Sequence, residues 1–542
     1  MNDPYKIRFG YIFYRRGRRP RLPAKAPSDE GAVERKRNWG RELYNISFFS
    51  PSVTTMLCHL PRQREADKRK DICNICRGYL RIARKLGEKM KTLIPKNTLF
   101  NTAIGEQKYS DNTEYRFFTF VVKHEYKGEY LLFNTLSRQM VSLTKYEYNG
   151  ITDNIKDNLY EQLVKDYFLV PVSHNDIKLK EQYISLIPLF DNPKGITNYI
   201  IFPTMDCNAR CFYCYERGAK KYPMTDKTAN DVADYIIKKS LGQKVSIQWF
   251  GGEPLYNQNP INIITDKLRD SGIEYKAKMI SNGYLFDDET VKNAKEKWNL
   301  KSVQITLDGT EEVYNRCKAY IYKTDESPFY RVLDNIERLL KSGIKVSVRM
   351  NMDRHNKDDL YNLVDVLKER FTEYKDLLYA YTFLLFDNFN LSNSARPADE
   401  KRELTRQQMK IEEYIAECGF GTNSVPKDKL TLNYCMADDD RSTTILPNGN
   451  LGKCEHYSDE GFWGSIYSDE RNNDIISEWK KLREPIDLCA TCPILPQCKK
   501  LKNCPDDFEC DKYVQAQKLS KLYRQMQNAY DKFLKENPES NG

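Results

Sequence analysis

The chain has 542 residues, which is enough for two to four domains with cores of their own. No apolar run reaches the length of a membrane span, and no apolar stretch near the N-terminus ends in a cleavage site, so we expect neither a transmembrane helix nor a signal peptide. We therefore expect a cytoplasmic protein without a membrane partner. In that compartment its 15 cysteines are more often metal ligands than disulfides.

The net charge of +10 is concentrated in residues 1–89, which hold 15 Arg and 7 Lys against 9 acidic residues. The rest of the chain is slightly acidic, so we expect no nucleic-acid partner. Residues 1–89 are interpreted as a basic, disordered arm, or as a non-native extension before a biological start at Met90. Within them, Cys58-His59 and the pair Cys73 and Cys76 have the spacing of a small zinc site.

Residues 90–185 predict a small β-meander followed by helices. Strand-like segments at 117–122, 130–133 and 139–143 are separated by turn sequences, and two helical patterns follow. No cluster of catalytic residue types occurs in this part of the chain. It is either a packing domain or an edge-strand platform for an extended peptide.

Residues 190–400 alternate strand and helix patterns six times. Six βα units predict a parallel sheet curled into a partial barrel, with the chemistry on the loops that follow the strands. We therefore expect an α/β fold containing a partial (β/α)6 TIM-like barrel. The strand-like runs are 199–203, 245–250, 277–280, 303–307, 346–350 and 381–386.

The remaining chain divides into three parts. Residues 401–434 are a polar, helical bridge, and residues 435–515 are rich in cysteines and turn residues. Residues 516–542 continue an amphipathic terminal helix whose apolar stripe is interpreted as packing.

Cys207, Cys211 and Cys214 follow the first strand of the predicted barrel with the spacing CxxxCxxC. Three thiolates this close in sequence can hold three irons of a 4Fe–4S cluster and leave the fourth iron open to a substrate or cofactor. A zinc ion and ordinary buried thiols are the alternatives. No fourth zinc ligand follows nearby, and buried cysteines need no fixed spacing.

Gly251-Gly-Glu-Pro254 closes the second predicted strand. Two glycines let the backbone approach a ligand closely, and the Glu253 carboxylate can accept hydrogen bonds from an ammonium group. Taken alone, this sequence is equally that of an ordinary turn.

Together, the cysteine spacing and the Gly-Gly-Glu-Pro stretch resemble the radical S-adenosylmethionine (SAM) enzymes. The resemblance implies that the three cysteines hold a 4Fe–4S cluster whose open iron binds the amino and carboxylate groups of SAM. Lys318 stands where the family has an arginine and loses its bidentate fork, so Arg316 and Arg349 are alternatives. The residues implied to bind the cofactor are Tyr213 near the adenine, Gly251, Gly252 and Glu253 at the ammonium, Asn282 in an Asn-Gly turn, Thr306 near the ribose, and Lys318 or Arg349 at the carboxylate.

Seven further cysteines resemble the SPASM extension of radical enzymes that modify peptides and proteins. The resemblance implies two auxiliary 4Fe–4S clusters, and therefore three clusters in all. The second auxiliary cluster lacks an obvious fourth cysteine, for which Cys418 and Cys317 are the spare thiols; an open iron that binds the substrate is the alternative. A zinc-ribbon repeat is the alternative for the whole region. The implied ligands are Cys489, Cys492, Cys498 and Cys510 for one cluster, and Cys435, Cys454 and Cys504 for the other.

Glu455 directly follows Cys454. In the sulfatase-maturing relatives an aspartate in this place is thought to accept a proton while the substrate is oxidised, which makes Glu455 the candidate catalytic residue. The alternative is a solvated surface glutamate, and His456 is equally ambiguous.

The segment at residues 90–185 resembles the recognition element of ribosomal-peptide maturases, a winged-helix-like domain that binds a leader peptide by strand addition. We therefore expect a radical SAM oxidoreductase that crosslinks or oxidises a ribosomally synthesised precursor peptide, with a reducing partner such as flavodoxin or ferredoxin. A formylglycine-generating, sulfatase-maturing enzyme and a non-enzymatic iron–sulfur electron carrier are the alternatives.

Overall fold

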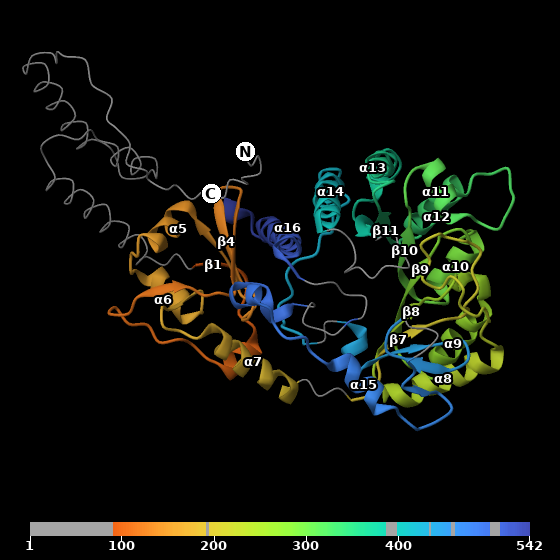
Figure 1. Cartoon of the computed structure of the whole chain (residues 1–542), viewed down its shortest axis with the longest axis horizontal. Coiled ribbons are helices and arrows are strands. Elements are labelled where there is room, and N and C mark those ends of the chain that lie inside the picture. The colour runs from red at the N-terminus through yellow and green to blue at the C-terminus, as the bar shows by residue number, and fades with distance from the viewer. Residues whose placement is uncertain are drawn as a thin grey trace, which may run out of the picture. The chain divides into compact units, whose positions relative to one another are not determined.

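The computed structural model describes residues 90–190, 194–385, 398–432, 435–456, 461–498, 504 and 510–541 (Figure 1). The described residues all belong to one compact unit that spans residues 89–542. The interpretations placed on residues 1–89, including the small zinc site, lie outside the described residues. Within the described ranges, no helix is long and apolar enough to cross a bilayer.

The first sheet is antiparallel, in the order β1-β5-β4-β3. Strands β3 and β4 are joined by Lys127 and Gly128, both with positive φ, which is the backbone of a tight hairpin turn that matches the strand twist. The predicted meander is confirmed. Its strands are β1 (Lys91–Ile94), β3 (Val121–Tyr126), β4 (Glu129–Asn134) and β5 (Met140–Thr144).

The first predicted strand begins later than the sequence indicated, at Val121 instead of residue 117. The residues before it form a separate short strand, β2 (Tyr115–Phe117), which pairs with β6 (Leu169–Pro171). Phe118 and Phe120, between β2 and β3, are buried edge to face against each other, so the chain turns into the core at this point.

Helices α4 (Thr98–Ala103), α5 (Lys145–Thr152), α6 (Asn158–Lys165) and α7 (Asp176–Phe190) accompany this sheet. Thr144 and Glu147 form a capping box at the start of α5, and Asp157 caps α6, so both helices begin where their side chains satisfy backbone N–H groups. The likeness of this part to a winged helix stays a prediction.

The second sheet contains the six predicted parallel strands, in the order β12-β11-β10-β9-β8-β7. Consecutive strands of this set are connected through helices, and the predicted α/β partial barrel is confirmed (Figure 1). The strands are β7 (Asn198–Ile201), β8 (Val245–Trp249), β9 (Tyr275–Ser281), β10 (Leu300–Thr306), β11 (Lys345–Met352) and β12 (Leu378–Leu384).

The connecting helices bury one apolar stripe each against the sheet. In α12 the buried residues recur at helical spacing, from Phe329 through Val332, Ile336 and Leu339. The connections are α8 (Asp226–Ser240), η1 (Pro254–Asn257), α9 (Asn259–Asp270), α10 (Asp288–Glu296), α11 (Glu311–Lys318), α12 (Pro328–Lys341), α13 (Asp359–Phe371) and η2 (Thr372–Tyr374).

The two faces of the parallel sheet differ because side chains alternate along each strand. On β11, Val346, Val348 and Met350 are buried in the core with the helices. The intervening residues point to the inner face of the barrel, which is polar and partly exposed; on β9 these inner residues include Lys276 and Lys278.

The cysteine-rich segment extends the same sheet, a relationship that the sequence did not indicate. Strand β13 (Ser442–Ile445) pairs in parallel with β7, and β14 (Asn450–Gly452) and β15 (Gly464–Ser465) follow antiparallel. Cys435 precedes β13 and Cys454 follows β14, and the two thiols are close enough to influence each other's ionisation. The short helices here are η4 (Met436–Asp438), α15 (Asn473–Lys480), η5 (Asp487–Thr491) and η6 (Leu495–Gln497).

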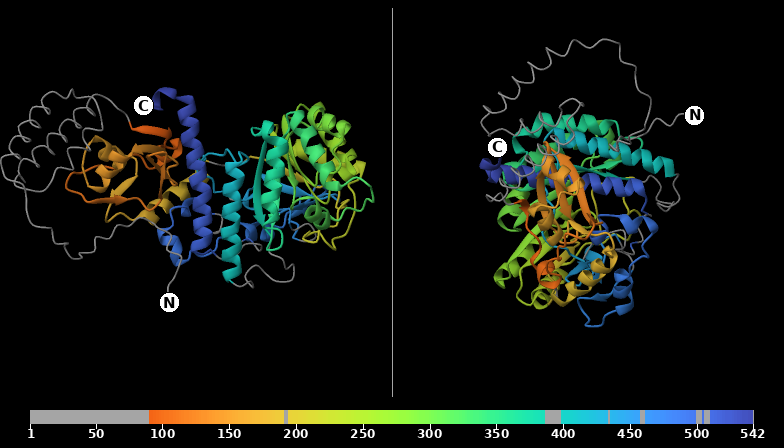
Figure 2. Two further views of the ribbon diagram at one scale, coloured as in Figure 1. Left: turned by 90° about the horizontal axis from the view of Figure 1, so that it is seen from above. Right: turned by 90° about the vertical axis from the view of Figure 1, so that its left-hand side faces the viewer.

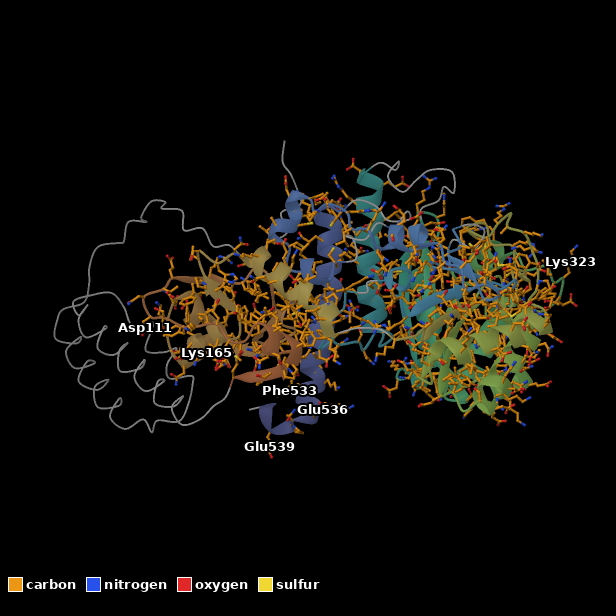
Figure 3. The ribbon with its side chains drawn as sticks, turned by 90° about the horizontal axis from the view of Figure 1, so that it is seen from below. Asp111, Lys165, Lys323, Phe533, Glu536 and Glu539 are labelled. Carbon is orange, nitrogen blue, oxygen red and sulfur yellow. The ribbon has the colours of Figure 1, made fainter. Side chains whose placement is uncertain are left out.

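The bridge forms α14 (Ala398–Glu417), and the terminal segment forms α16 (Lys512–Glu536) followed by η8 (Pro538–Asn541). These two long helices lie side by side, and Arg524 of α16 donates to the Glu412 carbonyl at 2.8 Å (Figure 2). Figure 3 labels Phe533 and Glu536 near the end of α16.

Helix α16 also packs on the first sheet. Leu522, Met526 and Tyr530 share a core with residues of β3 and β4, and the Tyr523 ring stacks on His124 at 4.6 Å. The interpretation of the apolar stripe as packing is confirmed.

Candidate functional site

Three thiols lie in the loop after β7, at the carboxyl end of the parallel sheet. Burial raises the pKa of the Cys207 thiol to about 12, and the Glu253 carboxylate and the thiols of Cys211 and Cys214 add to this effect. Burial likewise raises the pKa of Cys214. The three thiols are therefore close to one another, in surroundings that favour a bound cation over free thiolates.

The described residues contain no group of three His, Cys, Asp or Glu side chains arranged around a single metal ion. A 4Fe–4S cluster makes a different demand, because each thiolate binds a different iron and the sulfurs need not converge on one point. The spacing and clustering of the three thiols fit such a cluster.

Gly251 and Gly252 lie directly against this cysteine loop. A Cβ atom at Gly251 would be 2.4 Å from the Thr204 carbonyl oxygen, and one at Gly252 would be 2.2 Å from that of Asp206. The amide of Gly252 donates to Thr204 O at 3.2 Å, and that of Glu253 donates to Asp206 O at 2.8 Å. The close approach that the sequence indicated is thus to the backbone of the cysteine loop.

Glu253 is fully buried and held by three donors. Its carboxylate accepts from the Ser281 hydroxyl at 2.9 Å, from the Asn282 amide at 2.8 Å and from the Leu255 amide at 3.2 Å. Burial nevertheless raises its pKa to about 7. A carboxyl group in this state gains most from a cationic ligand, because a positive charge stabilises its ionised form.

Two buried polar atoms near the loop have no hydrogen-bond partner within the described ranges: Nδ2 of Asn208 and Oδ1 of Asp308. Asn208 accepts through its other amide atom from Asn282 Nδ2 at 2.6 Å, and Asn282 Nδ2 lies 3.9 Å from the Cys207 sulfur. Buried polar groups are rarely left unpaired, so an unpaired donor and acceptor here indicate the place of a polar ligand. Asn208 and Asp308 were not among the predicted site residues.

Lys318 lies in a buried triad with Tyr213 and Asp308. Its Nζ donates to the Tyr213 hydroxyl at 2.7 Å and lies 3.2 Å from Asp308 Oδ2, to which Tyr213 donates at 2.5 Å. Burial lowers the pKa of Lys318, but the Asp308 carboxylate and the Tyr213 hydroxyl outweigh it and hold the pKa well above the usual value. Lys318 therefore neutralises a buried carboxylate of its own chain.

Thr306 and Arg349 are register partners on β10 and β11 and belong to the inner face of the sheet. The Arg349 guanidinium stacks on the Phe383 ring at 3.8 Å, and its Nε donates to Asn351 Oδ1 at 2.9 Å. Arg316 lies elsewhere: its exposed side chain is 3.6 Å from Glu312 on the same helix.

The auxiliary thiols fall into the two predicted sets. Burial raises the pKa of Cys454 to about 12, and among its neighbours the Cys435 and Cys504 thiols add to the rise. Burial raises the pKa of Cys510, to which the Cys498, Cys492 and Cys489 thiols contribute. Their assignment as cluster ligands stays a prediction.

The spare thiol Cys418 packs in the hydrophobic core with Ile415 and Phe420, an ordinary environment for a buried cysteine. Cys317 is buried on α11. The fourth ligand of the cluster at Cys435, Cys454 and Cys504 therefore stays open.

Glu455 and His456 reach the first cysteine loop. The Tyr215 hydroxyl, one residue after Cys214, donates to the Glu455 carbonyl at 3.3 Å, and the Tyr215 and His456 rings lie 4.8 Å apart. Burial lowers the pKa of Lys278 on the inner face of the barrel, and the nearby Glu455 carboxylate opposes that shift. The auxiliary segment thus brings Glu455 between the cysteine loop and the barrel interior.

A parallel α/β sheet with three grouped thiols and a buried carboxyl at its carboxyl end is suited to bind an iron–sulfur cluster beside a cationic ligand. Residues 201–367 match the model of the Radical SAM superfamily, and this part of the chain is a radical SAM domain. Such a domain uses SAM and a 4Fe–4S cluster. The buried Glu253 and the unpaired atoms of Asn208 and Asp308 suit the ammonium and hydroxyl groups of SAM.

Similar proteins include GTP 3′,8-cyclase of Clostridium perfringens, which is 26% identical over 52% of this chain and 86% of its own length. The radical SAM cyclopropyl synthase TigE of Paramaledivibacter caminithermalis is 21% identical over 52% of this chain and 70% of its own length. Among solved structures, native anSMEcpe with bound AdoMet gives a TM-score of 0.48 at 16% identity, covering 62% of this chain and 99% of its own.

Proposed function

We propose that the protein is a radical SAM enzyme that crosslinks or oxidises a ribosomally synthesised peptide. The observation that carries the proposal is the contact of Tyr215 with Glu455 and His456. It joins the loop of the first three thiols to the segment that holds the other seven, so that both border the inner face of the barrel. A substrate in this space would meet the radical source and the auxiliary thiols together.

When bound and reduced by one electron, the cluster and SAM supply a 5′-deoxyadenosyl radical that abstracts hydrogen from a substrate carbon. The protein's own residues bind SAM and orient the cysteine loop. Glu253 would accept a hydrogen bond from the methionine ammonium of SAM, and Oδ1 of Asp308, which has no partner among the described residues, would accept one from a hydroxyl of the cofactor. The triad of Lys318, Tyr213 and Asp308 fixes the cysteine loop on α11, where the Arg210 amide also donates to the Lys318 carbonyl at 2.8 Å.

Glu455 is proposed to take the proton that the substrate loses as it is oxidised. Its carboxylate lies near the Lys278 ammonium at the inner face of the barrel, where a substrate proton could be transferred to it. The neighbouring thiols Cys435, Cys454 and Cys504 would hold an auxiliary cluster that accepts the electron or coordinates the substrate.

The inner face of the barrel supports an extended peptide as substrate. Strand β12 contributes Tyr379, Tyr381 and Phe383 in alternation, two of them exposed, and the Tyr381 hydroxyl donates to Gln304 at 2.7 Å. Lys278 and Arg349 add positive charge to this face, with the Glu455 carboxylate near Lys278. An aromatic strip beside these two cations favours a peptide segment with acidic side chains.

The edge of β3 supports leader binding by strand addition. The hydrogen bond from the Thr135 amide to the Phe120 carbonyl, 2.8 Å long, fixes the alternation of the β3–β4 ladder. From this pair onward, every second residue of β3 bonds to β4, and the residues between them direct their backbone N–H and C=O groups away from β4. Lys123 and Glu125 are two of these intervening residues. An extended leader peptide would pair there.

The test is anaerobic reconstitution with iron, sulfide and SAM, followed by dithionite reduction and chromatography of the products. We expect 5′-deoxyadenosine, and a mass change in a precursor peptide encoded next to this gene that depends on its leader. Absence of 5′-deoxyadenosine would favour the alternative that the protein is a non-enzymatic electron carrier. A formylglycine in a Cys- or Ser-containing sulfatase peptide, with the precursor unchanged, would favour the sulfatase-maturing alternative, and GTP should give no product.

A further inference from the structure

Four thiols lie together beside the first turns of helix α16. Burial raises the pKa of the Cys510 thiol, and the Cys498, Cys492 and Cys489 thiols add to that rise. Cys492 and Cys498 are themselves buried. These four residues are the four-thiol group, and their influence on one another fits a 4Fe–4S cluster in which each iron takes one thiolate.

Two side chains of α16 reach this group from one face of the helix. Lys518 Nζ donates to the Cys498 sulfur at 3.4 Å. Burial raises the pKa of the Cys492 thiol, and a hydrogen bond from Gln515 opposes that rise. Residues three apart on a helix are neighbours on its surface, so Gln515 and Lys518 act on the four-thiol group side by side.

The Lys518 ammonium acts on more than one of the thiols. The side chain is half-buried, and its charge opposes the rise that burial causes in the pKa of Cys510. Among the residues that the structure describes, Cys498 is the hydrogen-bond partner of Lys518. The positive charge therefore lies at buried sulfur atoms, where a charge acts more strongly than it does in water.

A second cation holds the loop that carries Cys498. Arg138, between β4 and β5, is 2% exposed and donates to Gln497 Oε1 at 2.7 Å and to the Lys427 carbonyl at 2.8 Å. Burial lowers the pKa of Arg138 to about 10, so the guanidinium stays charged at neutral pH. Because Gln497 directly precedes Cys498, Arg138 fixes this thiol where Lys518 can reach it.

The other auxiliary thiols have a charge of opposite sign beside them. Burial raises the pKa of Cys454, and the Glu455 carboxylate adds to that rise. The adjacent Lys453 is buried and donates to the Asp439 carbonyl at 3.1 Å. The charge of Lys518 thus distinguishes the four-thiol group from the thiols around Cys454.

We propose that Lys518 is a positioning residue that acts through Cys498 and raises the reduction potential of a cluster at the four-thiol group. The inference rests on the proposed function, which assigns these thiols to a cluster. The reduced form carries one more negative charge than the oxidised form, so a cation and a hydrogen bond at a ligand sulfur stabilise it. The electron is one that the substrate loses on oxidation, and no bond forms or breaks in its transfer.

The experiment is a redox titration of the reconstituted full-length protein, followed by electron paramagnetic resonance. The signal that Cys489→Ala/Cys492→Ala removes identifies the cluster of the four-thiol group. Lys518→Met keeps the size of the side chain and removes its charge, and should favour the oxidised form at least tenfold, which lowers the midpoint potential by about 59 mV or more. Lys518→Arg should retain most of the wild-type potential.

Two controls separate this effect from a general loss of charge. Lys521→Met removes an exposed lysine of the same helix and should leave the potential unchanged. In Lys518→Met, the signal that Cys435→Ala/Cys454→Ala removes should also keep its wild-type potential.

Iron content tells a structural role from a tuning role. Lys518→Met should bind as much iron as the wild type, and loss of the cluster signal in this variant would overturn the proposal in favour of a role in assembly. An unchanged potential, or an equal shift in Lys521→Met, would also overturn it. Absence of the signal from the wild type would contradict the cluster assignment and the inference with it. A shifted potential in a protein that forms no 5′-deoxyadenosine would support the role of Lys518 and contradict the proposed function alone.

Discussion

Lys318 Nζ lies 3.2 Å from Asp308 Oδ2, and both side chains are almost completely buried. Lysine and aspartate are rarely buried unless they are paired, so each side chain here offsets the free-energy cost of burying the charge of the other. The Tyr213 hydroxyl bonds to both groups and belongs to the CxxxCxxC loop. This relationship links helix α11 to the position of the cluster thiols.

Asp308→Asn should therefore destabilise the fold more than an exposed substitution does. It leaves Lys318 buried without its counter-charge, for which we expect a loss of about 3–5 kcal/mol in the free energy of unfolding. The double variant Asp308→Asn/Lys318→Met should recover a large part of that loss. Urea denaturation of the three proteins measures this, and additive losses would show that the two residues do not interact.

Gly252→Ala should displace the cysteine loop, because a Cβ atom would stand 2.2 Å from the Asp206 carbonyl oxygen. We expect the reconstituted variant to lose roughly a third of its iron, the share of one cluster in three. The control is Gly150→Ala in α5, where the nearest atom, Ile155 Cδ1, is 3.9 Å from a built Cβ. Iron content equal to the wild type in Gly252→Ala would contradict the packing argument.

Glu253 should make stability fall as pH rises. Its folded pKa of about 7 exceeds the ordinary 4.5, so between these values the folded state keeps a proton that the unfolded state has lost. The stabilisation is complete below about pH 4.5 and is lost as pH rises through 7, a change of about 3 kcal/mol.

Urea denaturation of the metal-free protein at pH 5 and pH 8 measures this effect, and Glu253→Gln should remove it. His124 has a pKa lowered by burial and gives a smaller dependence of opposite sign, which is the same in both proteins. An identical pH dependence in wild type and variant would show that Glu253 ionises normally.

Lys278→Met should raise the KM for an acidic precursor peptide by up to about fivefold, because one exposed charge contact is worth about 1 kcal/mol at most. Formation of 5′-deoxyadenosine without peptide should stay unchanged. Lys292→Met, on the exposed surface of α10, serves as the control. An unchanged KM would remove Lys278 from the peptide site.

The sequence predicted the parallel strands because their buried residues form continuous apolar runs, and it predicted the three thiols because cluster ligands need close spacing. It did not reveal the partner of Lys318, since Asp308 meets it only after the chain has turned through α11. The sequence did not predict the pairing of β13 with β7 for a similar reason. The two strands are more than 200 residues apart, and the residue pattern of neither strand indicates which strand it pairs with.

Gly251 and Gly252 illustrate a different limit. The sequence correctly indicated a close backbone approach, but a glycine pair carries no information about what approaches it. Only the folded chain shows the carbonyl groups of Thr204 and Asp206 in that place.

The most direct test of the central claim is 5′-deoxyadenosine formation by the reconstituted, dithionite-reduced wild type and its Cys211→Ala variant. We predict that the wild type cleaves SAM, and that the variant forms no 5′-deoxyadenosine while it keeps roughly two thirds of its iron in the auxiliary clusters. Absence of the product from the wild type, or its undiminished formation by the variant, would contradict the account.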